Sequence, residues 1–288
     1  MKLLNRLNRN QKIETHAKTQ SRRDTAKEKH SKISLRILCG LLHLREVLCF
    51  LCKALTCNGS QQPILLCCFI AMIPFVAAAQ EFTFVRVQWE SDRQSYGFAF
   101  RGDGPLWAHD YPIAEQNLHT AVTALTSVPM NEESKILRLD EEELFEYPFL
   151  YICEVGYWTL GDREAEILRE YLLRGGFLLV DDFRSTFEWS NFEEQIRRIL
   201  PDSPLQRLTI EHPIFHCFFD FEHLLEYAPY GGLEPRYYAI LDKAGRIMVL
   251  VNYNNDIGDG WEWPESDRTF STEAFRLAIN YIIYAMTH

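Results

Sequence analysis

Two adjacent carboxylates, Asp181 and Asp182, directly follow an apolar run with the sequence FLLV. Four apolar residues in a row are typical of a strand that is buried on both faces. The two carboxylates should therefore lie where that strand ends, and in a parallel sheet this edge is where ligands bind. Two roles stay open: hydrogen bonding to the following loop, which the sequence favours, and a ligand or metal site.

A second carboxylate-rich segment, residues 252–262, has the sequence NYNNDIGDGWE. Its acidic members are Asp256, Asp259 and Glu262. Carboxylates at this density suit hard cations or the hydroxyl groups of sugars. The spacing departs from that of a calcium-binding loop, because the turn glycine and the twelfth-position glutamate are misplaced. A tight turn held by Asn and Asp side chains is the favoured alternative, and Trp261 and Trp263 either stack on a sugar or cover the core.

A pair of histidines, His212 and His216, stands four residues apart, with Pro213 between them. Proline excludes the interior of a helix, so the two rings need not face the same way and do not form a metal-binding helix. Glu211 is placed to orient His212, and a role in fixing a loop is favoured. The full set of candidate ligand-binding residues is Asp181, Asp182, His212, His216, Asp256, Asp259 and Glu262.

Cys153 is the one candidate nucleophile, with His212 and a carboxylate as its partners. Nucleophiles on sheets of this kind sit on a sharp elbow that is flanked by glycines. Here Ile152 precedes the cysteine, and Cys153 itself belongs to the apolar run FLYIC. The sequence therefore argues against nucleophilic catalysis and assigns no catalytic residue.

Alternating strand and helix patterns must position these side chains. A strand at 149–153, a helix ending at Arg174, a Gly175-Gly176 stop and a strand at 177–180 form a βαβ unit, which implies a parallel sheet. Further strands are expected at 82–88, 135–139, 238–241 and 247–251, the last two as a hairpin, and further helices at 114–127, 192–200 and 272–286. We predict an α/β domain, a three-layer α/β/α sandwich with a mostly parallel, flavodoxin-like sheet. Its carboxyl edge would carry Glu154 and the loop after Val251 beside the aspartates.

The segment Ile64–Ala79, ILLCCFIAMIPFVAAA, has the form of a secretory apolar region with a cleavage site at Ala77-Ala78-Ala79. We therefore predict a poorly structured leader at 1–63, which would include residues upstream of the true start. The signal segment would be 64–79, and a single domain would occupy 80–288. Cleavage after Ala79 would place the domain outside the cytoplasm, in the periplasm. The alternative is an uncleaved anchor at 64–79, the one contact with the membrane.

Charge divides the chain at the same boundary. Residues 1–79 hold 13 Lys and Arg against 4 Asp and Glu, a net charge of +9, which leaves −19 for residues 80–288. So acidic a domain repels phosphate backbones, which argues against nucleic acid as a partner. Six of the eight cysteines precede Ala79, so only Cys153 and Cys217 remain, as a single bridge or, as favoured, two buried thiols.

Five motifs together resemble domain-of-unknown-function family 4159. They are DYP at 110–112 with Asn117-Leu118, YPFLY at 147–151, GGFL at 175–178 with DDF at 181–183, HPIFH at 212–216, and NDIGDGWE at 255–262. The resemblance implies a fold similar to the class I glutamine-amidotransferase-like group, a flavodoxin-like sandwich, in a bacterial protein that is often exported. It brings no activity with it, and the amidotransferase elbow is missing.

These observations favour a non-catalytic module of the cell envelope that binds a small ligand or an envelope protein. The alternative is an envelope hydrolase that acts on a glycan or similar substrate through Asp182, Asp256, Asp259 and Glu262. No organic cofactor is expected, and a divalent cation stays open. Convergence of these carboxylates on one pocket at the sheet edge would favour the enzyme.

Overall fold

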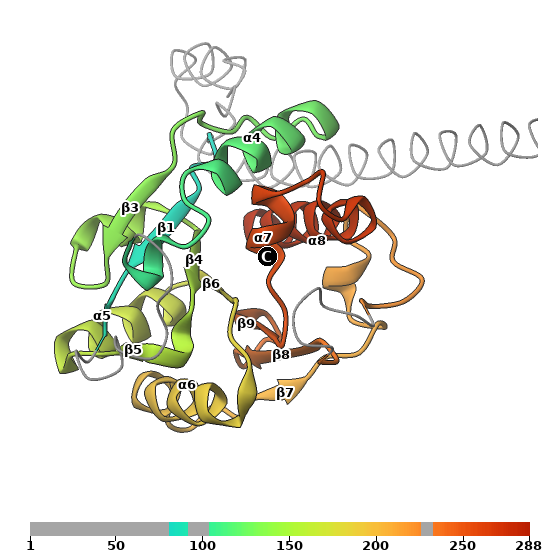
Figure 1. Ribbon diagram of the computed structural model, residues 1–288. Helices are drawn as coiled ribbons and strands as arrows, with labels where there is room; N and C mark the ends of the chain where they lie inside the picture. Colours follow the sequence, from blue (N-terminus) through green and yellow to red (C-terminus); the bar gives the residue numbers. More distant parts are fainter. Residues whose placement is uncertain (1–80, 92–103, 226–232) are drawn as a thin grey trace, which may run out of the picture. The chain divides into compact units, whose positions relative to one another are not determined.

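A computed structural model describes residues 81–91, 104–225 and 233–288 (Figure 1). The predicted leader and signal segment, residues 1–79, lie outside the described residues. Seven strands form one sheet in the order β3-β1-β4-β6-β9-β8-β7. Their bounds are β3 Lys135–Arg138, β1 Val85–Gln88, β4 Phe149–Cys153, β6 Phe177–Asp181, β9 Ile247–Tyr253, β8 Arg236–Leu241 and β7 Gln206–Arg207. Strands β2 (Glu90–Ser91) and β5 (Trp158–Thr159) form a small antiparallel pair beside it.

The centre of the sheet is parallel, as the βαβ pattern predicts. Strand β1 pairs in parallel with β3 and β4, β4 with β6, and β6 with β9. The exception is the predicted hairpin, where β8 runs antiparallel to β9 and β7 antiparallel to β8. The turn of this hairpin needs Gly245, whose φ of 85° is poorly tolerated by other residues.

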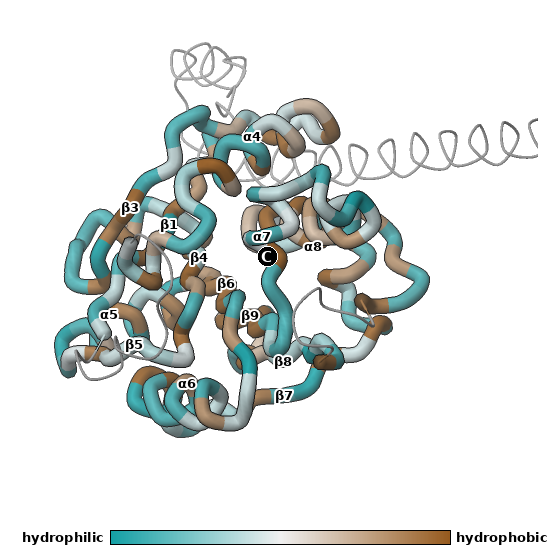
Figure 2. The backbone as a smooth tube through the Cα atoms, viewed as in Figure 1, coloured by the Kyte–Doolittle hydropathy of each residue, from teal (hydrophilic) through white to brown (hydrophobic). Residues whose placement is uncertain are grey.

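Helices cover both faces of the sheet. Alternate residues of β4 show this: Phe149, Tyr151 and Cys153 pack with α4 (Ile113–Leu125), α7 (Ile257–Glu262) and α8 (Arg268–Thr287). The residues between them pack with α5 (Asp162–Leu173) and α6 (Ser185–Ile199). Figure 2 shows hydrophobic colour along the central strands and hydrophilic colour on the outer turns. The α/β class is confirmed, with a mostly parallel sheet between two helical layers.

Helix α6 begins at Ser185, seven residues before the predicted start at 192. The side chain of Glu188 accepts a hydrogen bond from the Arg184 N–H at 2.6 Å, and the Ser185 hydroxyl accepts one from the Glu188 N–H at 3.3 Å. This reciprocal pair satisfies N–H groups that an uncapped first turn leaves without partners. The predicted helix began too late because hydrogen bonds of the Ser185 and Glu188 side chains, and not an apolar stripe, fix its first turn.

Residues Ile257–Glu262 form helix α7 and not the tight turn that was favoured. Asp256 makes the expected Asx-type hydrogen bond, since its side chain accepts from the Asp259 N–H at 3.0 Å, but this bond caps a helix. Helix α8 likewise begins four residues before its predicted start, with Asp267 accepting from the N–H groups of Thr269 and Phe270.

Short 3-10 helices complete the connections: Leu106–Ala108, Glu142–Glu146, Val155–Tyr157 and Pro213–Phe215. Within the described residues, no helix has the length and apolar character needed to cross a bilayer.

Candidate functional site

The carboxyl ends of three neighbouring strands meet at one point of the sheet. Strand β4 ends before Glu154, β6 ends at Asp181 and is followed by Asp182, and β9 leads to Asp256. Strand β1 lies beside β4, but the next strand of this sheet along the chain is β3, on the other side of β1. The strand order therefore proceeds to one side of β1 toward β3 and then to the other side toward β4. At such a switch point the loops that follow β1 and β4 diverge and leave room for a ligand.

The loop after β1 supplies a histidine that the sequence reasoning missed. His109 Nδ1 donates a hydrogen bond to Asp182 Oδ2 at 2.8 Å and lies 3.7 Å from Asp110 Oδ1 and 3.9 Å from Glu154 Oε1. The ring is half-exposed, whereas the Asp182 side chain is fully buried. On its other side, Asp182 Oδ1 accepts from the Arg184 guanidinium at 2.6 Å. Asp182 is therefore held between two cations.

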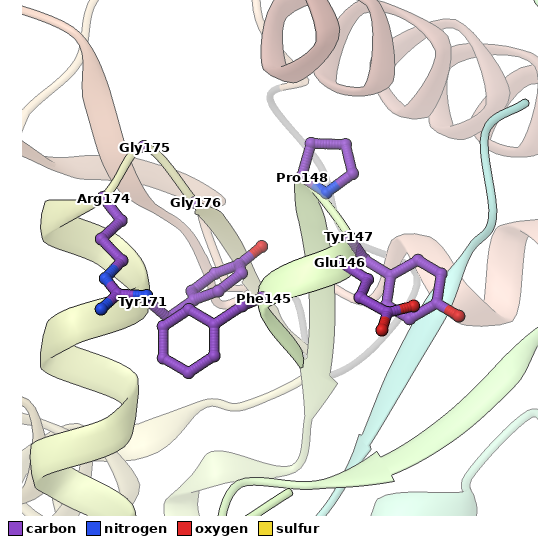
Figure 3. Close-up of a pocket in the computed structure, with 8 residues that line it drawn as sticks. All are labelled: Phe145, Glu146, Tyr147, Pro148, Tyr171, Arg174, Gly175 and Gly176. Carbon is purple, nitrogen blue, oxygen red and sulfur yellow. The ribbon is translucent and has the colours of Figure 1, made fainter. Parts of the chain in front are cut away.

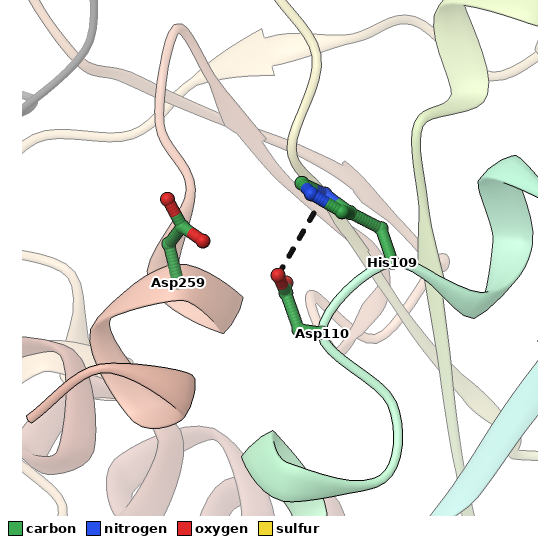
Figure 4. Close-up of side chains that lie close together, drawn as sticks. All are labelled: His109, Asp110 and Asp259. Atoms are coloured by element: carbon green, nitrogen blue, oxygen red, sulfur yellow. Dashed lines mark ion pairs between the residues drawn. The ribbon is translucent and has the colours of Figure 1, made fainter. Parts of the chain in front are cut away.

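Asp110 and Asp259 also lie close to His109, and Figure 4 shows these three side chains with the His109–Asp110 ion pair as a dashed line. Asp110 belongs to the loop before α4, and Asp259 to the first turn of α7. The Asp110 side chain is fully buried, and neither of its oxygens accepts a hydrogen bond from a described residue. Its carboxyl group instead faces the carboxyl group of Asp259, with which it can only share a proton.

Left-handed backbone is concentrated at this edge of the sheet. Asp110, Glu154 and Asp182 have φ values of 66°, 55° and 49°, a region that costs free energy for residues with a side chain. In Glu154 the strained turn comes directly after β4, and its N–H donates to the Asp182 carbonyl at 3.0 Å. A sharp turn therefore exists after β4, but its side chain is a glutamate and not a cysteine.

A buried arginine holds the loop that carries His109. The Arg86 side chain, on β1, is 0% exposed and pairs with Glu115 of α4 at 2.5 Å. Its guanidinium also donates to the carbonyl oxygens of Trp107 and His109, at 3.1 and 2.8 Å. Because these bonds fix the backbone on either side of Ala108, Arg86 is a positioning residue for His109.

The cluster contains acidic groups with opposite pKa shifts. Although burial opposes its ionisation, the hydrogen bond from His109 and the charge of Arg184 lower the pKa of Asp182. Burial, reinforced by the charge of Asp182, raises the pKa of both Asp110 and Glu154 to about 9. The hydrogen bond to Asp182 raises the pKa of His109 to about 10, so at neutral pH its ring is an imidazolium.

The charge of Asp182 also acts on Asp256, which caps α7, and on Asp259 in its first turn. Burial, followed by the negative charge of Asp182, raises the pKa of Asp259 and raises that of Asp256 well above its ordinary value. Asp256 Oδ2 approaches the Arg184 guanidinium at 3.5 Å. Within the described residues, the cluster therefore has more carboxyl groups than cations. The cations that face these groups are His109 and Arg184, and Arg86 lies behind His109.

Asp181 has the structural role that the sequence favoured, but its partner is the first turn of α7 and not the loop that follows β6. Its oxygens accept hydrogen bonds from the N–H groups of Ile257 and Gly258 at 3.0 and 3.1 Å, from the Asn252 amide at 3.1 Å and from the Tyr151 hydroxyl at 3.3 Å. Burial, then the charge of Asp182, raises its pKa to about 7. Asp181 anchors α7 to the sheet and offers no free oxygen to a ligand.

The two candidate histidines belong to another part of the molecule. His212 Nδ1 accepts from the Ile214 N–H at 3.2 Å, and its ring lies 6.2 Å from that of Tyr284, whose hydroxyl bonds the first residue of β9 at the opposite edge. His216 bonds Asp220 and the Ile210 carbonyl, both at 2.5 Å. Both side chains fix loops, as favoured.

Glu262 and the two tryptophans lie around the cluster and not in it. Glu262 ends α7, near enough for its charge to act on Asp259. Trp261 is buried in the core, whereas Trp263 is 59% exposed. Of the candidate ligand-binding residues, the structure therefore brings together Asp182, Asp256 and Asp259, with Asp181 beneath them and Glu262 at the margin.

Cys153 has none of the properties of a nucleophile. It is a strand residue that is 1% exposed, and burial raises the pKa of its thiol well above the ordinary value. Its sulfur lies 3.2 Å from the Arg86 guanidinium, and His212 lies elsewhere. Cys153 and Cys217 are both free thiols, but only Cys153 is buried as favoured, whereas Cys217 is partly exposed.

A separate hollow of about 330 Å³ opens at the amino edge of the sheet (Figure 3). It is lined by Phe145, Glu146, Tyr147, Pro148, Tyr171, Arg174, Gly175 and Gly176. Pro148 and Gly176 precede β4 and β6, so the hollow lies at the end of the sheet away from the carboxylates. Because it contains no converging set of titratable groups, we place the chemistry at the carboxyl edge.

His109, Asp110 and Arg184 were not identified from the sequence. Asp110 belongs to the DYP motif, but the spacing of that motif does not connect it to the other aspartates. The signal that could have found both loop residues is the edge rule itself, because they are in the long connection that follows β1.

A family model described as "Domain of unknown function (DUF4159)" matches residues 85–286, most of the chain. No curated protein matches the sequence. The chain therefore belongs to this family, as its motifs indicate.

Proposed function

We propose that this member of the DUF4159 family is an exported binding module whose ligand occupies the carboxylate cluster and brings positive charge to it. The apolar segment Ile64–Ala79 supports export, and the acidic charge of residues 80–288 supports a partner other than nucleic acid. A small ligand or the basic side chain of an envelope protein would meet the same requirement.

The observation that carries this proposal is the buried Asp110 carboxyl group, neither oxygen of which accepts a hydrogen bond from a described residue. Removing a carboxylate from water without a donor or a cation costs several kcal/mol. The backbone strain at Asp110, Glu154 and Asp182 adds to that cost. Groups that are strained, buried and electrostatically perturbed together are typical of functional sites. A positively charged ligand would displace the protons from these carboxyl groups and pair with the carboxylates that remain.

Thermal unfolding of the purified chain with a panel of probes tests this proposal. The panel holds choline, spermidine, L-arginine amide, and Mg²⁺, Ca²⁺, Mn²⁺ and Zn²⁺ alone, with glucose and succinate as neutral and anionic controls. A ligand at a hundred times its Kd stabilises by about 2.7 kcal/mol, which raises Tm by roughly 5–10 °C in a domain of this size.

We expect at least one cation to raise Tm, and the rise to disappear in Asp182→Asn. The matched control is Asp202→Asn, because Asp202 is exposed at the end of α6 and outside the cluster. The proposal is wrong if no cation raises Tm, or if both variants keep the same rise.

A second function, acid–base hydrolysis, is favoured by the opposite pKa shifts in one cluster. An ionised Asp182 beside a protonated Glu154 has the form of a base and an acid that work together at neutral pH. Chromogenic glycosides and esters would report turnover. Hydrolysis that falls at least 100-fold in Glu154→Gln would support this function, and binding without turnover would support the binding module alone.

A further inference from the structure

The Asp110 carboxyl group is buried without a hydrogen-bond donor among the described residues. Its side chain is 0% exposed, and neither oxygen accepts a hydrogen bond within the described part of the chain. The groups that it faces are the imidazole of His109 and the carboxyl group of Asp259, neither of which satisfies it. Buried carboxylates almost always have donors or a metal ion, so the surroundings of Asp110 are incomplete.

Four further side chains surround the same space. His109 forms one set of three with Asp110 and Asp259, and a second with Glu154 and Asp182, and the ligand atoms of each set lie within 4.8 Å of one another. From His109 Nδ1, the carboxylate oxygens of Asp182, Asp110 and Glu154 lie at 2.8, 3.7 and 3.9 Å. Ligands bound to one small ion at about 2.1 Å are roughly 3 Å apart, so only small movements are needed.

We propose that a divalent transition-metal ion, Mn²⁺ or Zn²⁺, binds in this cluster. Its ligands are His109, Asp110 and Asp259, with Asp182 and Glu154 available on its other side. The ion then supplies the positive charge that the proposed function requires, so this inference rests on that function and names its ligand. An imidazole among carboxylates selects Mn²⁺ or Zn²⁺, because Ca²⁺ and Mg²⁺ take oxygen ligands.

Residues behind the ligands hold them in position. Arg184 bonds Asp182 Oδ1 at 2.6 Å, which leaves Oδ2 directed at His109. Asp256 accepts from the Asp259 N–H at 3.0 Å and fixes the first turn of α7. Arg86 bonds the His109 carbonyl at 2.8 Å. Metal ligands are usually oriented by an outer shell of this kind.

Glycine at 258 gives Asp110 its space. A Cβ at this position would collide with the Asp110 carboxylate and would lie 2.8 Å from the Tyr151 hydroxyl. The backbone of α7 therefore approaches Asp110 more closely than any residue with a side chain permits. The five ligands come from the loop before α4, the ends of β4 and β6, and α7, so the site forms only in the folded domain.

Titration calorimetry of the purified chain, freed of metal with EDTA and dialysed, tests the proposal. Mn²⁺ and Zn²⁺ are titrated at pH 7, with Ca²⁺ and Mg²⁺ as comparison ions. We expect one Mn²⁺ or Zn²⁺ per chain, and at least tenfold weaker binding in Asp110→Asn, Asp259→Asn and His109→Gln. The matched controls are Asp202→Asn and His223→Gln, both at exposed positions outside the cluster, which should bind as the unchanged chain does.

Circular dichroism of each metal-free variant verifies its fold. Because the His109 ring is half-exposed, His109→Gln still tests the site if a variant at a buried position fails to fold. Binding of neither ion, or equal affinity in the cluster variants and the controls, overturns the proposal. Tighter binding of Ca²⁺ than of Mn²⁺ and Zn²⁺ also overturns it. If no metal binds but an organic cation raises Tm in an Asp182-dependent way, the metal site fails and the proposed function stands. If neither binds, both fail.

Discussion

Replacing Asp110 with asparagine should stabilise the metal-free protein, although the residue belongs to the candidate site. The side chain of asparagine has almost the same shape, and asparagine tolerates the φ of 66° at this position better than most residues. The substitution therefore removes a buried ionisable group, which must take up a proton on folding, with little change in backbone strain. Its amide can donate to the carboxyl group of Asp259, which faces it.

The magnitude follows from the raised pKa of Asp110. With a pKa of about 9 in the folded protein against 3.8 as the ordinary value, folding at pH 7 requires the carboxyl group to take up a proton. Three pH units at about 1.4 kcal/mol each give a ceiling of about 4 kcal/mol. The second amide hydrogen lacks a partner, which costs about 1–3 kcal/mol. We expect a net stabilisation of about 1–2 kcal/mol at pH 7.

The pH dependence has a definite sign. An acid whose pKa is raised on folding binds more protons in the folded than in the unfolded chain between pH 4 and pH 9. The free energy of unfolding therefore falls as pH rises through that window. Asp110→Asn lacks this contribution, so its advantage over the unchanged chain should grow from pH 5 to pH 9.

Urea unfolding in EDTA at pH 5, 7 and 9 measures this difference, with Asp202→Asn as the control. A variant that is less stable at every pH would refute the reasoning, as would an advantage that does not change with pH. Adding Mn²⁺ should reverse the order, since only the unchanged chain has all the ligands.

Two further tests concern residues that support the cluster, and a third concerns the amino-terminal segment. Arg86→Met should lower the free energy of unfolding, measured with urea, by about 3–5 kcal/mol, because it leaves Glu115 buried without its cation. Adding Glu115→Gln should recover part of this loss. An equal loss in the double variant would contradict the explanation. Gly258→Ala should weaken Mn²⁺ binding at least tenfold in calorimetry, whereas Gly104→Ala, where a Cβ meets no atom within 4 Å, should leave it unchanged. Amino-terminal sequencing of the chain from expressing cells should begin at Gln80, and recovery of intact Met1–Ala79 would instead indicate an anchor.

Local patterns were sufficient to predict most of the fold. Continuous apolar runs such as 149–153 can be satisfied only by a strand covered on both faces, and Gly175 with its φ of 115° ends the preceding helix region. Together they predict a parallel sheet. The errors were at helix starts, at α6 and α7, where the hydrogen bonds of Glu188 and Asp256 decide between turn and helix.

The sequence determined at which edge of the sheet the site lies. Carboxylates that follow buried parallel strands must emerge at the same edge, and Asp182, Asp256 and Asp259 lie together there. Only the tertiary structure decided which of them face a ligand. Asp181 and Asp182 are neighbours in the chain, but the backbone turns into the left-handed region at Asp182, and one side chain anchors α7 whereas the other meets His109. His109 itself arrives from 73 residues away. The order of the strands in the sheet brings His109 to Asp182, and local sequence patterns do not specify that order.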